Sequence, residues 1–308
     1  MSVLLPEGLP AVRILADEGL DVETHAEGAR ASNADLVIAI LNLMPDKVAT
    51  ETQLIRMLAD GPRRVETVLF ATDTYMERVR DPAYSSQNTP VDHLRRFYRT
   101  FSEVRDLDID GLIITGAPVE KEPYEDVPYW EELLQVFGWA EQQSLGVFNI
   151  CWAAQAALQH FHGVPKYVLD QKLFGVFPHR IENNSPLLDG FGAGFEIPVS
   201  RHSEILRSDL PDSPDLKVLA GSQGSGLGLL EDQRLRHLYI FNHFEYDLET
   251  LKREYDRDAD AGMPIQVPQN YYPDDDPSRP PEMRWQQDGR RLYQNWLATI
   301  ENAKSTKN

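Results

Sequence analysis

The stretch Gly146-Val-Phe-Asn-Ile150-Cys151-Trp152-Ala-Ala-Gln-Ala-Ala157 decides the fold. Its first five residues are apolar apart from one asparagine, which predicts a strand that is buried on both faces. The residues after Cys151 are mostly small and helix-forming, so we expect a helix to begin at Trp152. Cys151 therefore lies on a strand-to-helix turn, where open α/β sheets present side chains to their ligands.

Similar apolar segments recur along the chain and alternate with helical patterns. Strands are expected at residues 36–41, 65–70, 111–116, 145–150 and 238–242, and helices at 50–58, 91–100, 129–143, 152–161 and 248–258. This alternation predicts an α/β fold with an open, mostly parallel sheet, flanked by helices that form right-handed crossovers.

One segment, residues 173–213, interrupts this alternation with Gly, Pro and Asn residues. We expect turns and short antiparallel strands there, as a small insertion within one domain that spans residues 1–300. A last helix carries Leu292, Trp296 and Ile300 on one face and should dock on the domain. The final residues, 301–308, are expected to form a frayed tail.

Composition and charge narrow the possible functions. The 308 residues include 30 Lys and Arg against 49 Asp and Glu, and a net charge of −19 argues against nucleic acid as a partner. The longest apolar run, about residues 36–44, is too short to cross a membrane. A single cysteine and an N-terminus without signal-peptide character predict the cytoplasm as the location.

The position of Cys151 favours a nucleophile over a small buried core thiol, because the amino end of a helix stabilises a thiolate. Such a nucleophile needs a base, and His243 follows the apolar segment 238–242, which places it at the same edge of the sheet. Glu245, two residues further on, could orient the imidazole. The three residues together predict a Cys-His-Glu catalytic triad.

Other chemistry finds little support in the sequence. His160 and His162 are two residues apart on a predicted helix and point to different sides, so we predict no metal site. No phosphate-binding glycine motif occurs, which argues against ATP or a nicotinamide cofactor. The glycines at residues 222–226 are expected to form a turn between strands.

Several segments together resemble the homoserine O-acyltransferases of bacterial methionine biosynthesis, which have a class I glutamine amidotransferase-like, flavodoxin-like fold. The resemblance spans about residues 5–296. It is carried by Asn42-Leu-Met-Pro-Asp-Lys47 with Glu51, Asn88-Thr-Pro90, Thr115-Gly-Ala-Pro118, Cys151-Trp152 with Gln155, Val199-Ser-Arg201, His243-Phe-Glu-Tyr-Asp247 and Asn270-Tyr-Tyr-Pro273.

The resemblance implies a role for each matching residue. Cys151 corresponds to the acyl-accepting nucleophile, His243 to the general base and Glu245 to the residue that orients that base. Residues implied to bind or position substrate are Lys172, Ser200 and Arg257, the last of which would bind the homoserine carboxylate. Glu120 matches the position at which the family separates acyl donors, and glutamate there accompanies acetyl-CoA.

The expected reaction is transfer of an acetyl group from acetyl-CoA to the γ-hydroxyl of L-homoserine through an acyl-cysteine intermediate. The resemblance implies no cofactor and no metal, small-molecule substrates and a homodimer. Succinyl-CoA is the alternative donor. Two departures, Phe244 where the family often has proline and an apparent insertion at residues 73–86, leave serine open as an acceptor.

Two other functions stay open at this point. A glutamine amidotransferase would use the same triad to release ammonia, and it would need a synthase domain or partner to consume that ammonia. A non-catalytic member of the fold could act as a binding or chaperone-like module, although all three triad residues are present.

Overall fold

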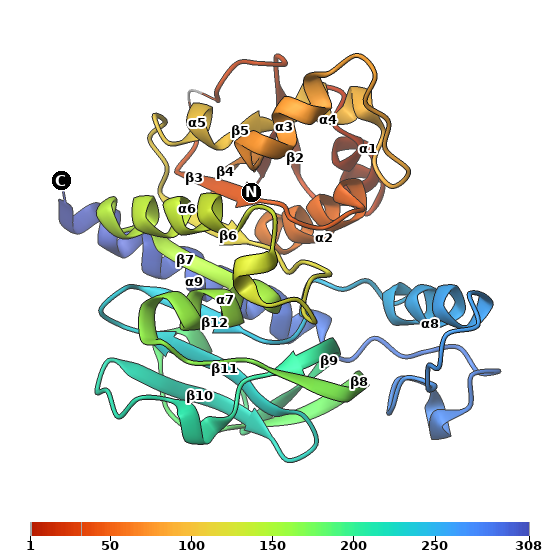
Figure 1. Ribbon diagram of the computed structural model, residues 1–308. Coiled ribbons are helices and arrows are strands. Elements are labelled where there is room, and N and C mark those ends of the chain that lie inside the picture. Colours follow the sequence, from red (N-terminus) through yellow and green to blue (C-terminus); the bar gives the residue numbers. More distant parts are fainter. Residues whose placement is uncertain (1, 32, 308) are drawn as a thin grey trace.

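A twelve-stranded sheet runs through the computed structural model, which describes residues 2–31 and 33–307 (Figure 1). The strand order is β2-β1-β4-β3-β6-β7-β12-β11-β10-β8-β9, and β5 pairs with β4. The strands of the parallel part are β1 (Val3–Pro6), β2 (Val22–His25), β3 (Leu36–Leu41), β4 (Val65–Ala71), β5 (Arg99–Thr100), β6 (Gly111–Ile114), β7 (Gly146–Ile150) and β12 (His237–Ile240). The predicted open, mostly parallel α/β fold is confirmed.

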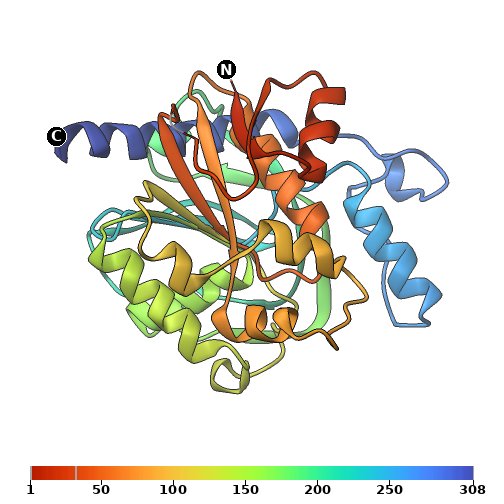
Figure 2. The ribbon, with the colours of Figure 1, turned by 90° about the horizontal axis from the view of Figure 1, so that it is seen from above.

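Helices cover both faces of the parallel part, as Figure 2 shows for α6 and α9 on opposite sides. One face packs against α1 (Pro10–Asp17), α2 (Lys47–Ala59), α3 (Asp73–Arg80), α4 (Val91–Phe97) and α9 (Gln286–Lys307). The other packs against α5 (Phe101–Val104), α6 (Trp130–Gln142) and α7 (Trp152–His162). In β3, Ile38 and Ile40 enter the first core and Ala39 and Leu41 the second, because successive side chains point to opposite faces.

The antiparallel part extends the same sheet. It consists of β8 (Tyr167–Ile181), β9 (Gly194–Glu204), β10 (Leu216–Ser222) and β11 (Gly226–Asp232). The expectation of short strands at residues 173–213 is wrong, because β8 is 15 residues long and begins before that segment. Gly175 does not break β8: it lets the backbone of Gln269 approach so closely that a Cβ would lie 2.3 Å from the Gln269 carbonyl oxygen.

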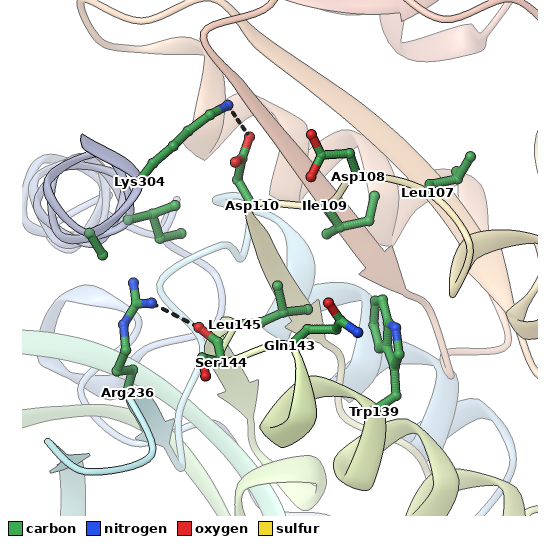
Figure 3. Close-up of a pocket in the computed structure, with 12 residues that line it drawn as sticks. Leu107, Asp108, Ile109, Asp110, Trp139, Gln143, Ser144, Leu145, Arg236 and Lys304 are labelled. Atoms are coloured by element: carbon green, nitrogen blue, oxygen red, sulfur yellow. Dashed lines mark hydrogen bonds and ion pairs between the residues drawn. The ribbon is translucent and has the colours of Figure 1, made fainter. Parts of the chain in front are cut away.

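The last helix also differs from the expectation, since α9 continues to Lys307 instead of fraying after residue 300. Figure 3 shows the reason: Lys304 of α9 reaches Asp110 at the start of β6. The Lys304 Nζ atom donates to Asp110 Oδ2 at 2.9 Å and to the Asp35 carbonyl at 3.1 Å. These bonds hold the last turns of the helix against the amino edge of the sheet.

The remaining elements are short 3₁₀ turns and the helix α8. Short 3₁₀ turns lie at Tyr124–Asp126, Pro186–Leu188, Arg207–Asp209 and Pro273–Asp275. Helix α8 (Thr250–Asp260) stands out beside the sheet in both ribbon views (Figures 1 and 2). Among residues 2–31 and 33–307, no helix combines the length and apolar character that crossing a membrane requires.

Replacing the buried His237 with phenylalanine is expected to make the protein less sensitive to acid. Burial lowers the pKa of His237 from 6.5 to about 3. Below about pH 6.5 the unfolded chain therefore takes up a proton that the folded protein does not, and stability falls with pH. At about pH 4.5 this costs roughly 3 kcal/mol. Phenylalanine keeps the ring contact with Phe161, whose centroid is 4.9 Å away.

Urea unfolding near neutral pH and near pH 4.5 measures this effect. We expect the variant to lose less free energy of unfolding between the two conditions than the wild type. An equal loss in both proteins would show that the proton uptake occurs elsewhere, for example at His179, whose pKa burial lowers to about 4.

Candidate active site

Cys151 occupies the turn between β7 and α7, as the sequence pattern predicts. Its backbone has φ 52° and ψ −114°. Residues other than glycine rarely adopt this conformation, which costs about 1–3 kcal/mol. The Cys151 amide donates to the Ile240 carbonyl at 2.7 Å, which ties the turn to the end of β12. The turn therefore projects a thiol, 4% exposed, from the carboxyl edge of the sheet.

The structure brings His243 and Glu245 to this thiol. His243 Nδ1 donates to Glu245 Oε1 at 2.6 Å, and the same imidazole lies close enough to Cys151 to lower the pKa of its thiol. Tyr246 stacks on the imidazole, with centroids 4.1 Å apart and planes 14° from parallel. The His243 amide donates to the Pro198 carbonyl at 2.9 Å. The ring is thus fixed on several sides.

Burial and neighbouring charges shift the pKa values of Cys151 and His243 in opposite directions. Burial raises the pKa of the Cys151 thiol, and the neighbouring His243 is the largest influence that lowers it. Burial by itself would lower the pKa of His243, but the charges of Glu245 and Cys151 outweigh it and raise that pKa well above 6.5. The site therefore favours a thiolate only when an imidazolium stands beside it.

Two backbone features complete the surroundings of the sulfur. Trp152 is the first residue of α7, so its N–H has no partner within the helix and can donate to a developing oxyanion. Gly116, just after β6, lies so close that a Cβ on it would be 3.2 Å from Cys151 Cβ. The glycine keeps the approach to the thiol open.

Glu120 also lies beside the thiol. Its Oε1 atom is 3.9 Å from Cys151 Sγ and accepts a hydrogen bond from the His202 amide at 3.2 Å. The Lys166 amine donates to the carbonyls of Glu120 and Glu122 and so holds this loop in place. Burial raises the pKa of Glu120. A second carboxylate at this point would be poorly tolerated.

Lys172 of β8 and Ser200 of β9 meet at Glu254 of α8. Lys172 Nζ donates to Glu254 Oε2 at 2.9 Å, and Ser200 Oγ donates to the same oxygen at 2.6 Å. Arg257 bonds to Asp258 at 2.7 Å through a side chain that is 67% exposed. These contacts form the polar end of the site.

A cavity of about 210 Å³ joins these groups. Of the predicted site residues, six line it: Glu120, Cys151, Lys172, Ser200, His243 and Arg257. The seventh, Glu245, contacts His243. The structure therefore assembles all seven residues around one space.

Sequence reasoning missed three further residues at the site. Glu254 precedes Arg257 by three positions, so helical spacing could have placed both on one face. Tyr246 lies inside the segment that contains His243 and Glu245. Arg201 is fully buried and donates to the Ser225 carbonyl and the Asn242 side chain, and its charge lowers the pKa of Cys151. Arg201 lies in the Val199-Ser-Arg201 segment that carries the family resemblance, but its burial could not be read from the sequence.

The two histidines considered for a metal site are used otherwise. His162 pairs with Asp232 at 3.0 Å, and His160 stacks on Phe137. Within the described part of the chain, no group of three or more His, Cys, Asp or Glu side chains could hold a metal ion.

Comparison with protein families gives a match to the homoserine O-succinyltransferase model over residues 2–305. A homoserine O-acetyltransferase of Ruegeria sp. (strain TM1040) is 46% identical over 301 residues, which cover 97% of this chain and 94% of that protein. A homoserine O-acetyltransferase of Synechococcus elongatus is 45% identical over 298 residues, which cover 96% of this chain and 97% of that protein.

Solved structures show the same fold at low sequence identity. A glutamine amidotransferase from Thermotoga maritima superposes with a TM-score of 0.55 at 12% identity, covering 87% of this chain and 99% of its own. A glutamine amidotransferase from Methylobacillus flagellatus gives a TM-score of 0.51 at 15% identity, covering 85% and 94%. These likenesses support the amidotransferase-like fold and no more.

Proposed function

This chain belongs to the homoserine O-succinyltransferase family, and from that premise we propose that it transfers an acetyl group from acetyl-CoA to the γ-hydroxyl of L-homoserine. Acyl transfer to homoserine, an early step of methionine biosynthesis, follows from the family and from the relatives' names. The observation that carries the mechanism is the buried His243–Glu245 pair beside Cys151, which stands on a strand-to-helix turn.

In the first half of the reaction the Cys151 thiolate attacks the thioester carbonyl carbon. The backbone N–H of Trp152 stabilises the resulting oxyanion. The carbon–sulfur bond to coenzyme A then breaks, and the departing thiolate takes the proton of the His243 imidazolium. An acetyl group remains on Cys151.

In the second half His243, now neutral, removes the proton from the homoserine hydroxyl. The alkoxide oxygen attacks the acetyl carbon, and the bond to Cys151 breaks to give the O-acetyl product. The proton stays on His243, beside the regenerated thiolate. Glu245 holds the imidazole in place throughout and stabilises its charged form.

The polar end of the cavity suits an amino acid. Arg257 presents an exposed guanidinium at this end, where it can bind the homoserine carboxylate. Lys172 and Ser200 are held by Glu254 within the same cavity. An acceptor bound there would have its side-chain hydroxyl free to point towards Cys151.

Glu120 supports acetyl-CoA as the donor over succinyl-CoA. Its carboxyl group lies 3.9 Å from the sulfur that takes up the acyl group, where the distal carboxylate of a succinyl group would need room. Bulk and like charge both oppose that carboxylate. The relatives compared above are named acetyltransferases, whereas the family model carries the succinyl name.

The chemistry needs no cofactor beyond the acyl-CoA cosubstrate. We also propose the cytoplasm as the location and a homodimer as the assembly. The supporting observations are the single unpaired cysteine and the resemblance to the family.

A direct assay tests the reaction. Purified protein is given acetyl-CoA or succinyl-CoA with homoserine or serine, and free CoA is followed with a thiol reagent. Acetyl-CoA with homoserine should give the highest kcat/KM. Ammonia release from glutamine without any CoA-dependent transfer would indicate an amidotransferase instead.

Replacing Glu120 with glycine is expected to change the donor preference. The substitution removes both the bulk and the charge, so kcat/KM for succinyl-CoA should rise relative to that for acetyl-CoA by roughly a hundredfold. Glu120→Gln, which keeps the volume and removes the charge, should lie between. Steady-state kinetics with both donors measure the ratio. Donor choice lies elsewhere if neither substitution changes it.

A further inference from the structure

We propose that a groove beside the active-site cavity binds the pantetheine arm of the acyl-CoA donor and that Arg78 at its rim binds a phosphate of the same molecule. This inference rests on the proposed function. It concerns the pantetheine arm and the phosphates of the donor, which do not react and which the triad does not bind.

The groove encloses about 250 Å³ and adjoins the active-site cavity, because Met44 and Pro118 line both. Its walls come from the segments after β3 and β4, from α3 and from the loop that leads to Glu120. Most of its lining is apolar or aromatic. The lining residues used below are Lys47, Thr74, Tyr75 and Arg78.

The two substrates must reach Cys151 from different directions. The polar end of the cavity, where Lys172 and Ser200 meet Glu254 of α8 and Arg257 lies on the same helix, is suited to the amino acid. Pro118 lines both the cavity and the groove, and the Glu120 carboxyl group, 3.9 Å from Cys151 Sγ, marks the place of the acyl group. A thioester whose acyl group lies beside Glu120 can extend its other arm past Pro118 into the groove.

Lys47 is buried at the groove, and its amine is bound by backbone carbonyls. Lys47 Nζ donates to the Asn42 carbonyl at 2.6 Å and to the Met44 carbonyl at 3.1 Å, and burial lowers its pKa to about 7. The Tyr75 ring covers this amine at 4.8 Å from its centroid. The groove thus offers aromatic and aliphatic surface with few charges, which fits the pantetheine chain.

Arg78 stands at the outer end of this surface. Its guanidinium carbon is 5.7 Å from the Tyr75 centroid, and the side chain is exposed. Within residues 2–31 and 33–307 no carboxylate forms an ion pair with Arg78, whereas Arg80 on the same helix pairs with Glu103 at 2.9 Å. In a chain with 49 acidic residues, a guanidinium without such a partner is available for an anionic ligand.

This placement gives residues 73–86 a role, because α3 supplies Thr74, Tyr75 and Arg78 to the groove. The helix is anchored from behind by Met76 and Val79, which are buried in the core. One face of α3 therefore holds the fold, and the other is free to contact a ligand.

Replacing Arg78 with alanine tests the proposal. The KM for acetyl-CoA should rise about tenfold, as expected for loss of a charge-assisted hydrogen bond to phosphate, and the KM for homoserine should not change. The acetyl thioester of N-acetylcysteamine, which lacks the phosphates, should keep its KM within about twofold. Arg80→Ala, on the same helix but outside the groove, is the matched control and should leave all three values unchanged.

Calorimetric titration of CoA into the Cys151→Ala protein, with and without Arg78→Ala, measures the same contact without turnover. We expect Kd to rise about tenfold. In Thr74→Trp, which narrows the groove without removing a charge, the KM for acetyl-CoA should rise and the KM for the truncated thioester should rise less.

Two results would overturn the inference: an Arg78→Ala variant whose KM for acetyl-CoA stays within twofold of the wild type, or one whose KM rises equally for both thioesters. A wild-type protein that transfers no acyl group from any thioester would instead show that the proposed function is wrong. The two failures are therefore distinguishable.

Discussion

Replacing Cys151 with alanine is expected to reduce acyl transfer by at least about a thousandfold while the fold stays intact. Alanine has no atom that can take up the acyl group, so the reaction would have to proceed by direct attack. Cys151→Ser should be almost as inactive, because a hydroxyl does not form an anion as readily as a thiol. Release of free CoA measures the loss, and circular dichroism checks the fold.

Mass spectrometry of the wild type after incubation with acetyl-CoA alone should show one added acetyl group on the peptide that contains Cys151. The Cys151→Ala protein serves as the blank. Turnover near the wild-type rate in that variant, together with no trapped adduct, would rule out the covalent mechanism.

Replacing His243 with alanine is expected to cost about a thousandfold in kcat, and replacing Glu245 with alanine about ten- to a hundredfold. Without His243 the imidazole that carries the proton in both halves of the proposed reaction is lost. Without Glu245 the imidazole remains as a base, but it loses its 2.6 Å partner and the stabilisation of its charged form. Steady-state kinetics give the ranking. A more severe loss at Glu245 would mean that the two roles are reversed.

The conservative variant Glu245→Gln adds a pH test. The charge of Glu245 raises the pKa of His243, so removing that charge should lower this pKa. Homoserine attack requires a neutral imidazole, and the acidic limb of the kcat profile should therefore move to lower pH. A purely structural role for Glu245 would leave the limb in place.

The turn at Cys151 could be predicted because its signal is local. An apolar strand and a run of small helix formers meet at one residue, and the structure places β7 at Gly146–Ile150 and α7 at Trp152–His162. The position of His243 followed from the same rule, since β12 ends close before it. Parallel strands share one carboxyl edge, so the two predictions together brought these residues close.

Features that depend on tertiary packing could not be predicted. Glu254 acquires its importance only because α8 presents it to Lys172 and Ser200, which come from two antiparallel strands. The length of β8 escaped prediction for a similar reason. Gly175 suggests the end of a strand when only the sequence is known. In the structure it lies inside β8 and leaves room for the backbone of Gln269. Predicting either feature requires knowing which distant segment of the chain packs against it.

The backbone strain at Cys151 has an evolutionary consequence. A positive φ favours glycine at this position, so selection for thermostability alone would drive the residue away from cysteine. Selection for growth without external methionine would act in the opposite direction. A lineage supplied with methionine by its surroundings would no longer need the proposed nucleophile and would gain stability by replacing it with glycine.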